Sequence, residues 1–392
     1  MTHRHIYMIA GEASGDLLGA GLMKALKQQS TDDIEFSGIG GVEMTEQGLQ
    51  SLFPMETLSV MGVFEVLPRI PDLLKRIRMT IRDIEEKQPD VIVTIDSPDF
   101  CFRVVKAIKA RGKAKAPRVH YVAPSVWAWR PGRAKKVAQF LDHILALLPF
   151  EPPYFEKEGL DCTFIGHPMI EKDDIVHADG QAFRGKHDIP AEQKLLCVLP
   201  GSRNSELKRM LPVFQDVLKR LSKTHPDLKV VSVTLPHLKE RIQQAFSEYD
   251  VMVTDQDKYN AFAASDAAIA TSGTVALELG MTRTPSVIGY KMNAINTMLV
   301  KLLVKTKYVT LPNIILDRAV MPELLLEACT AEGITAETEK LLTDPAAVQA
   351  QKDGFDALYQ AFDGLSPSTR GAEVVLSLLG EQKKTAAIET AA

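Results

Sequence analysis

The sequence predicts an α/β protein with two Rossmann-like, doubly wound domains, and three observations support this prediction. The chain has 392 residues, which exceeds what a single hydrophobic core usually organises. Apolar runs of strand length alternate with stretches of helical period, the pattern of a parallel sheet connected by crossover helices. A polar, irregular stretch around residues 171–187 separates two such series. We therefore expect a first domain over residues 1–170 and a second over residues 171–345.

The strand-length runs locate the elements of both sheets. In the first domain we expect strands at residues 6–10, 35–38, 91–95, 119–122, 144–148 and 163–165. In the second domain we expect them at residues 195–199, 229–233, 251–253, 267–270 and 286–288. Ligands of such sheets bind at the carboxyl ends of the strands, so we expect the chemistry in a cleft where the two domains face each other.

The C-terminal part of the chain, residues 346–392, has mostly helical patterning. Residues 366–368 can cap a last helix through residues 371–379, and the tail from residue 383 is expected to fray. We expect these helices to pack back on the first domain.

Composition and charge exclude several classes of protein. Hydrophobic residues make up 45% and charged residues 24%, and the net charge is only −4, so no basic field attracts nucleic acid. The four cysteines are too scattered for a disulfide framework or a zinc site. Neither a secretory signal nor an apolar run of transmembrane length is present in the sequence, and we expect a cytoplasmic protein.

The strongest candidate site lies in residues 270–274, which follow a buried strand and open a helix. The backbone amides of such a helix start favour phosphate. Ser272 and Thr274 add hydroxyl donors, and Gly273 allows close approach of the backbone. Glu278 lies one helical turn further, where its carboxylate can accept from both hydroxyls of a ribose. The alternative is a capped helix with a solvated glutamate, and spacing alone does not decide between them.

A second turn after a strand contains Gly201, Ser202 and Arg203. The same logic applies, because a glycine permits the turn and the arginine offers a fork for phosphate oxygens. Taken singly, this segment is also compatible with an ordinary turn.

Asp96 is the candidate general base in the first domain. It follows the strand at residues 91–95, and Pro98 stops the chain there, which leaves a carboxylate at the edge of the sheet. Such a group can take the proton of an attacking hydroxyl. Asp99 competes for this role, although it is favoured as a turn-stabilising side chain.

Two further segments are candidates for the acceptor side of the site. Glu12, Ser14 and Asp16 lie in a glycine-rich turn before a helix that we expect to begin near residue 17. The acidic Glu12 and Asp16 would repel a phosphate, which suits a sugar acceptor better. The alternative for Asp16 is a helix N-cap. Ser125 and Trp127 belong to a segment whose indoles could stack on sugars or acyl chains, or simply pack in a loop core.

Closely spaced apolar residues near residue 64 are intermixed with arginine and lysine. This composition is typical of helices that lie on anionic lipid, although most such helices pack on their own sheet. The candidate membrane contacts are Val63, Phe64, Val66, Leu67 and Ile70.

Five motifs occur in order along the chain, at residues 11–16, 95–100, 121–129, 199–203 and 272–274. Together they resemble the lipid-A-disaccharide synthase family over residues 6 to about 316. The resemblance implies a GT-B architecture and inverting transfer of a diacylglucosamine unit. The donor is its UDP form, the acceptor is the 6-hydroxyl of diacylglucosamine 1-phosphate, and the products are a β-1,6-linked disaccharide 1-phosphate and UDP.

The resemblance also assigns roles to particular residues. It implies that Asp96 is the base, that Arg203 contacts the nucleotide phosphates, that Glu278 contacts the ribose and that Asn313 is a further residue of the donor site. It implies no metal and no cofactor, the UDP-sugar being a substrate. The partners that it implies are the two acylated sugars and the cytoplasmic face of the inner membrane, where the protein attaches peripherally, and a homodimer is left open.

Two competing interpretations remain at this point. An enzyme resembling UDP-N-acetylglucosamine 2-epimerase uses the same scaffold and needs no lipid acceptor. A non-catalytic two-domain ligand-binding protein is the second, but that class is usually exported.

Overall fold

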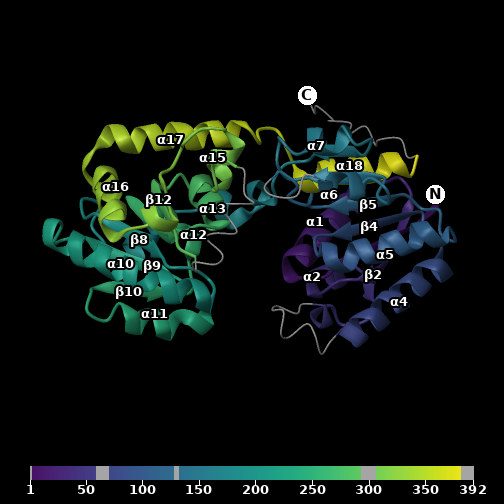
Figure 1. Cartoon of the computed structure of the whole chain (residues 1–392), viewed down its shortest axis with the longest axis horizontal. Helices are drawn as coiled ribbons and strands as arrows, with labels where there is room; N and C mark the ends of the chain where they lie inside the picture. Colours follow the sequence, from purple (N-terminus) through teal and green to yellow (C-terminus); the bar gives the residue numbers. More distant parts are fainter. Residues whose placement is uncertain (1, 59–69, 128–131, 293–305, 381–392) are drawn as a thin grey trace, which may run out of the picture. The chain divides into compact units, whose positions relative to one another are not determined.

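The computed structural model describes residues 2–58, 70–127, 132–292 and 306–380 (Figure 1). The candidate membrane residues Val63, Phe64, Val66 and Leu67 lie outside the described residues. The chain divides into two compact units. Unit 1 comprises Met1–Pro168 and Gly364–Ala392, and unit 2 comprises Met169–Asp363.

In the described part of unit 1, seven parallel strands form one sheet in the order β3-β2-β1-β4-β5-β6-β7. The strands are β1 His3–Ala10, β2 Asp33–Ile39, β3 Gln50–Ser51, β4 Val91–Ile95, β5 Arg118–Tyr121, β6 His143–Ala146 and β7 Asp161–Phe164. The helices are α1 Ala13–Gln29, α2 Val42–Glu46, α4 Ile70–Lys87, α5 Pro98–Arg111, α6 Gly132–Val137, α7 Pro152–Glu156 and α18 Pro367–Leu378.

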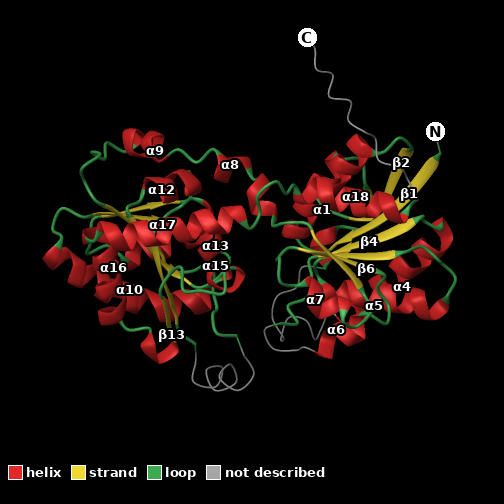
Figure 2. Cartoon of the chain, turned by 90° about the horizontal axis from the view of Figure 1, so that it is seen from above, coloured by secondary structure: helices red, strands yellow, loops and turns green. Residues whose placement is uncertain are grey.

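Six of these strands confirm the sequence-based prediction, with small shifts at their ends. Strand β5 ends at Tyr121 because Val122 has a φ of +80°, a conformation that a strand does not contain. Strand β3 was missed, since two residues are too few to show a period. Every residue of the central strand β4 is buried, because helices cover both faces of a parallel sheet (Figure 2).

In the described part of unit 2, six parallel strands form a sheet in the order β10-β9-β8-β11-β12-β13. The strands are β8 Leu195–Leu199, β9 Lys229–Val233, β10 Val251–Thr254, β11 Ala267–Thr271, β12 Ser286–Tyr290 and β13 Glu323–Leu325. The helices are α8 Asp173–Val176, α9 Gly180–Lys186, α10 Asn204–Thr224, α11 Lys239–Ala245, α12 Lys258–Ala264, α13 Val275–Met281, α15 Leu311–Ile315, α16 Ala331–Thr343 and α17 Pro345–Gln360. Five strands confirm the prediction, and only β13 was missed.

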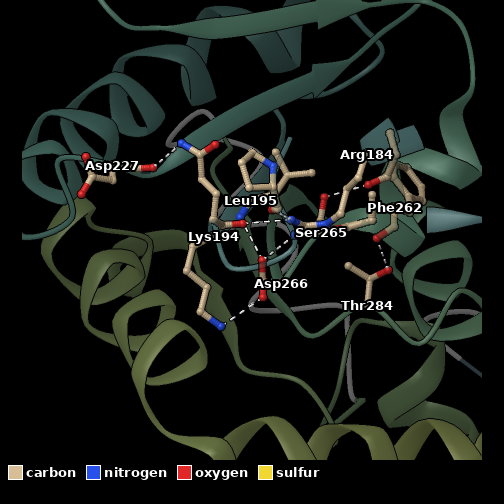
Figure 3. Close-up of polar contacts among 12 residues, drawn as sticks. Arg184, Lys194, Leu195, Asp227, Phe262, Ser265, Asp266 and Thr284 are labelled. Atoms are coloured by element: carbon tan, nitrogen blue, oxygen red, sulfur yellow. Dashed lines mark hydrogen bonds and ion pairs between the residues drawn. The ribbon is translucent and has the colours of Figure 1, made fainter. Parts of the chain in front are cut away.

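Asp266 braces the amino ends of the two central strands of unit 2, β8 and β11 (Figure 3). Its carboxylate accepts hydrogen bonds from the backbone nitrogen of Leu195 and from Arg184 Nη2, each at 2.9 Å, and from Lys194 Nζ at 3.0 Å. The strands then run side by side in register from this brace. Their carboxyl ends, at Leu199 and Thr271, therefore open at the same edge of the sheet.

The C-terminal helices divide between the two units, whereas the sequence led us to expect one segment packed on the first domain. Helix α17 packs against α13, α15 and α16 in unit 2. Helix α18 packs on α1 in unit 1, where Ala372, Val375 and Leu376 join the core. The division follows from the apolar faces, since each helix is buried against helices of a different unit.

None of the described helices is long and apolar enough to cross a membrane.

Candidate functional site

A cavity of about 450 Å³ lies at the carboxyl ends of β8, β9 and β11 in unit 2. Its walls include seven of the eight residues that the sequence assigned to a nucleotide: Gly201, Ser202, Arg203, Ser272, Gly273, Thr274 and Glu278. The two turns that sequence reasoning treated separately are therefore parts of one pocket. They meet because β8 and β11 are hydrogen-bonded neighbours in the sheet.

Glu278 is held by two residues that sequence reasoning missed. Lys258 Nζ donates to both carboxylate oxygens, at 2.7 and 2.6 Å, and Tyr259 Oη donates to Oε1 at 2.9 Å. Glu278 is only 9% exposed, so a neighbouring cation is needed to offset the cost of burying its charge. Burial and the nearby charge of Glu278 raise the pKa of Tyr259, which keeps its hydroxyl a donor. The nineteen residues between Lys258 and Glu278 include a whole strand, so no spacing rule indicates this pair.

The turn after β8 differs from the expectation that its backbone amides are free for phosphate. Glu206 Oε2 accepts from the backbone nitrogens of Ser202 and Arg203, at 3.0 and 3.3 Å. Its other oxygen accepts from Arg203 Nη1 at 3.2 Å. Glu206 therefore caps helix α10 from inside, as the third helical residue often does. The Arg203 side chain is 70% exposed and keeps most of its donors available.

Two hydroxyl groups in the pocket wall were not singled out from the sequence. Thr234 Oγ1 and Thr271 Oγ1 are buried, line the cavity and have no hydrogen-bond partner among the described residues. Thr271 ends strand β11 and is 3% exposed. A buried hydroxyl without a partner is unfavourable, so a ligand that bonds to these groups gains affinity.

Asn313 is not part of this pocket, in contrast to the sequence-based assignment. It is 1% exposed, and its amide makes four hydrogen bonds within the protein. It donates to the Met321 carbonyl and to Glu323 Oε1, and it accepts from the backbone nitrogens of Val320 and Met321. Asn313 therefore fixes the loop before β13 and does not line the cavity.

In unit 1, Asp96 lies directly after β4 and is partly exposed. It has a φ of +49° and Ser97 has a φ of +41°, so the chain turns sharply where β4 ends. Glu12 follows the neighbouring strand β1, whose Ala10 pairs with Ile95. Burial and then the charge of Asp96 raise the pKa of Glu12. The structure thus brings these two predicted carboxylates together at one edge of the sheet.

The remaining predicted acceptor residues near residue 14 lie on a helix that begins earlier than expected, at Ala13. Ser14 is exposed on the first turn. Asp16 is 4% exposed and accepts from the backbone nitrogens of Gly41, Glu43 and Met44 at 2.7 to 3.1 Å. Its carboxylate therefore caps α2 rather than its own helix, and these bonds leave it little capacity to contact a substrate.

Ser125 and Trp127 follow strand β5 in the loop that precedes α6. Ser125 is exposed, while the Trp127 ring is partly buried edge-on against Phe150, with centroids 5.3 Å apart. Trp127 Nε1 donates to Oε1 of the buried Glu151 at 3.3 Å. Burial raises the pKa of Glu151 to about 7. Glu151 was not singled out from the sequence.

Ile70, the one described member of the candidate membrane segment, is the first residue of α4 and is 39% exposed. Leu74, one turn later, is 38% exposed. Lys75 and Arg78 are exposed on the same helix. The start of α4 thus presents apolar and basic side chains together.

Comparison with known proteins identifies the family. The family model described as Lipid-A-disaccharide synthetase matches residues 6–371. Lipid-A-disaccharide synthase of Rhodospirillum centenum is 49% identical over 380 residues, which cover 95% of this chain and 94% of that protein. The protein of the same name from Paramagnetospirillum magneticum is 48% identical over 386 residues, covering 97% and 98% of the two chains.

Solved structures with the same fold are much less similar in sequence. UDP-GlcNAc 2-epimerase from Neisseria meningitidis bound to UDP-GlcNAc has a TM-score of 0.61 at 12% identity, covering 97% of this chain and 100% of that chain. The kitacinnamycin glycosyltransferase has a TM-score of 0.62 at 14% identity, covering 97% and 100%. These likenesses confirm the GT-B fold, which epimerases and glycosyltransferases share. The family match favours the transferase over the epimerase, and the chain belongs to the lipid-A-disaccharide synthase family.

Proposed function

We propose that this chain transfers a 2,3-diacylglucosamine unit from its UDP form to the 6-hydroxyl of 2,3-diacylglucosamine 1-phosphate, with inversion at the anomeric carbon. The observation that carries the proposal is the pocket of unit 2. It combines a carboxylate held in place, an exposed guanidinium and hydroxyls that have no partner among the described residues, at the ends of adjacent strands. These groups match the diol of a ribose and the oxygens of a diphosphate.

Five residues of the pocket have a stated role in this proposal. Arg203 donates to the diphosphate and stabilises the charge that develops as UDP leaves. Glu278 accepts from the ribose. Ser272 and Thr274 offer hydroxyl donors beside the phosphates, and Gly273 leaves room there, since no described atom beyond its chain neighbours lies within 4 Å of where a side chain would begin. The proposal includes no metal ion, because Arg203 supplies positive charge beside the leaving diphosphate.

On the acceptor side, Asp96 takes the proton of the attacking 6-hydroxyl. A bond forms between that oxygen and the anomeric carbon of the donor, and the bond from this carbon to the diphosphate oxygen breaks with its electron pair. The positive φ of Asp96 suits an aspartate, which tolerates this conformation better than most residues. Glu12 lies beside Asp96, and burial followed by the charge of Asp96 raises the pKa of Glu12.

We further propose that unit 1 attaches peripherally to the cytoplasmic face of the inner membrane, where its acylated substrates reside. The exposed Ile70 and Leu74 near Lys75 and Arg78 support this, since apolar contact and attraction to anionic lipid act together. The residues before Ile70 extend the same composition in the sequence.

The decisive experiment is a product assay with UDP-diacylglucosamine, with and without the diacylglucosamine 1-phosphate acceptor. We expect the disaccharide 1-phosphate and UDP to form only when the acceptor is present. Epimerised sugar or UDP released without acceptor would favour the epimerase, and binding without turnover would indicate a ligand-binding protein.

A further inference from the structure

The carboxylate of Glu278 has room for one ribose hydroxyl rather than two. Its two oxygens offer four lone-pair positions in all. Lys258 occupies one on each oxygen, and Tyr259 occupies a second on Oε1. When the described part of the chain is counted, a single position therefore remains, on Oε2. The other hydroxyl of a ribose needs a different partner.

Lys258 can be that partner. An ammonium group has three protons, and Lys258 uses two of them on Glu278. Its side chain is 39% exposed and lines the same cavity as Glu278. The ammonium group also lies 5.1 Å from the ring centre of Tyr259 and 5.6 Å from that of Phe262, which restricts its position.

Tyr259 is itself held in place by Lys172. Its hydroxyl oxygen accepts from Lys172 Nζ at 3.0 Å while it donates to Glu278. Lys172 also lies 4.8 Å from the Tyr259 ring centre. The carboxylate and the ammonium group are thus positioned before any ligand binds, which lowers the entropy lost on binding.

We propose that Lys258 and Glu278 together form a subsite for the ribose diol, in which Glu278 Oε2 accepts from one hydroxyl and Lys258 donates its third proton to the other hydroxyl oxygen. The inference rests on the proposed nucleotide function of the pocket. It makes Lys258 a residue that recognises ribose, which predicts discrimination against deoxyribose. A lysine that contacted only the diphosphate would not discriminate in this way.

The experiment compares two ligands on three variants of the full chain by isothermal titration calorimetry. The ligands are UDP and 2′,3′-dideoxy-UDP, which differ only in the diol. Lys258→Met keeps the alkyl stem but removes the donors, and Lys258→Arg keeps a cation that can contact both carboxylate oxygens and still donate. Lys239→Met is the matched control, since Lys239 also pairs with a carboxylate, Asp255, at 2.8 Å and is 40% exposed, but it does not line the pocket.

The unaltered chain should bind UDP at least about tenfold more tightly than dideoxy-UDP. In Lys258→Met this ratio should fall at least about fivefold, with the affinity for dideoxy-UDP almost unchanged. Lys258→Arg should retain most of the ratio, and Lys239→Met all of it. An unchanged ratio would overturn the proposal. If the affinities for both ligands fell equally, the result would assign Lys258 to the diphosphate and would likewise overturn the proposal.

Failure of the nucleotide function itself would look different, because the unaltered chain would then bind neither ligand. A loss of folding in Lys258→Met would be visible in its thermal unfolding. The ratio of the two affinities measured for Lys258→Arg then decides the question. If this variant folds but no longer discriminates between UDP and dideoxy-UDP, the result contradicts a donor role for a cation at this position.

Discussion

Trp127 Nε1 donates a hydrogen bond to Glu151 Oε1 across 3.3 Å, and that carboxylate is only 3% exposed. Glu151 Oε2 accepts from the backbone nitrogen of Leu148 at 3.1 Å. These bonds favour the ionised carboxylate, but burial outweighs them and raises the pKa of Glu151 from 4.5 to about 7.

The stability of unit 1 should therefore depend on Glu151 in a defined pH window. Because the folded chain holds this proton more tightly than the unfolded chain, the stabilising contribution is complete below pH 4.5. It is lost as the pH rises through about 7, by up to about 3 kcal/mol. The lowered pKa values of His120 and His167 act in the opposite direction, so the decline is measured as the difference in unfolding free energy between the unaltered chain and Glu151→Gln from pH 5 to pH 8. The same difference for Glu156→Gln, which changes an exposed carboxylate of α7, should show no such decline.

Asp96→Asn should reduce turnover by about 10²- to 10⁴-fold, because it removes the proposed proton acceptor. The affinity for UDP should stay within about twofold, since the nucleotide groups lie in unit 2. Asparagine tolerates the φ of +49°, so the turn after β4 is retained. Asp99→Asn, in the first turn of α5, serves as the control and should remain active. Parallel loss of UDP binding and turnover in Asp96→Asn would mean that Asp96 acts structurally.

Arg203→Ala should weaken UDP binding by about tenfold or more, because a charge-assisted bond to the diphosphate is lost. The matched control is Arg209→Ala, on the same helix, whose guanidinium donates to the Ser205 carbonyl and lies outside the pocket. Calorimetric titration with UDP measures both. An unchanged dissociation constant in Arg203→Ala would exclude the proposed contact.

Thr271→Val should leave the melting temperature unchanged or higher, since the hydroxyl has no partner among the described residues. The affinity for UDP should fall several-fold if the hydroxyl contacts the nucleotide. Thr284→Val is the control with the opposite pattern, because Thr284 Oγ1 donates to the Phe262 carbonyl at 2.8 Å (Figure 3). It should lower the melting temperature and spare UDP binding. If the melting temperature of Thr271→Val were as low as that of Thr284→Val, the result would show that the Thr271 hydroxyl has a protein partner.

Polar replacement of the apolar segment should weaken binding to anionic vesicles without unfolding unit 1. The replaced residues are Val63, Phe64, Val66 and Leu67. Sedimentation with vesicles measures the bound fraction, and circular dichroism checks the fold. Val42→Ser is the control, since Val42 is 68% exposed in the same unit but lies outside the segment. An unfolded protein would instead favour a core helix.

Local patterns predicted the strands well, because each strand of a parallel sheet is buried on both faces and so appears as an apolar run. The segments 91–95, 195–199 and 229–233 were predicted with their observed ends. The sequence pattern did not reveal β13, because this partly exposed strand of three residues lacks such an apolar run. It also misplaced the start of α1, since glycine at position 15 indicated a turn although the helix contains it.

The sequence by itself determined the fold class, the position of the Gly201 to Arg203 and Ser272 to Thr274 turns, and the family. Only the tertiary structure decided which of the polar groups are available to a ligand. Glu206 accepts from the amides of one turn, the Asn313 amide in α15 is hydrogen-bonded to residues at and before β13, and Lys258 pairs with Glu278. The physical reason is that local apolar periodicity in the sequence is enough to predict helices and strands. The hydrogen-bond partner of a side chain depends instead on which strands become neighbours in the sheet.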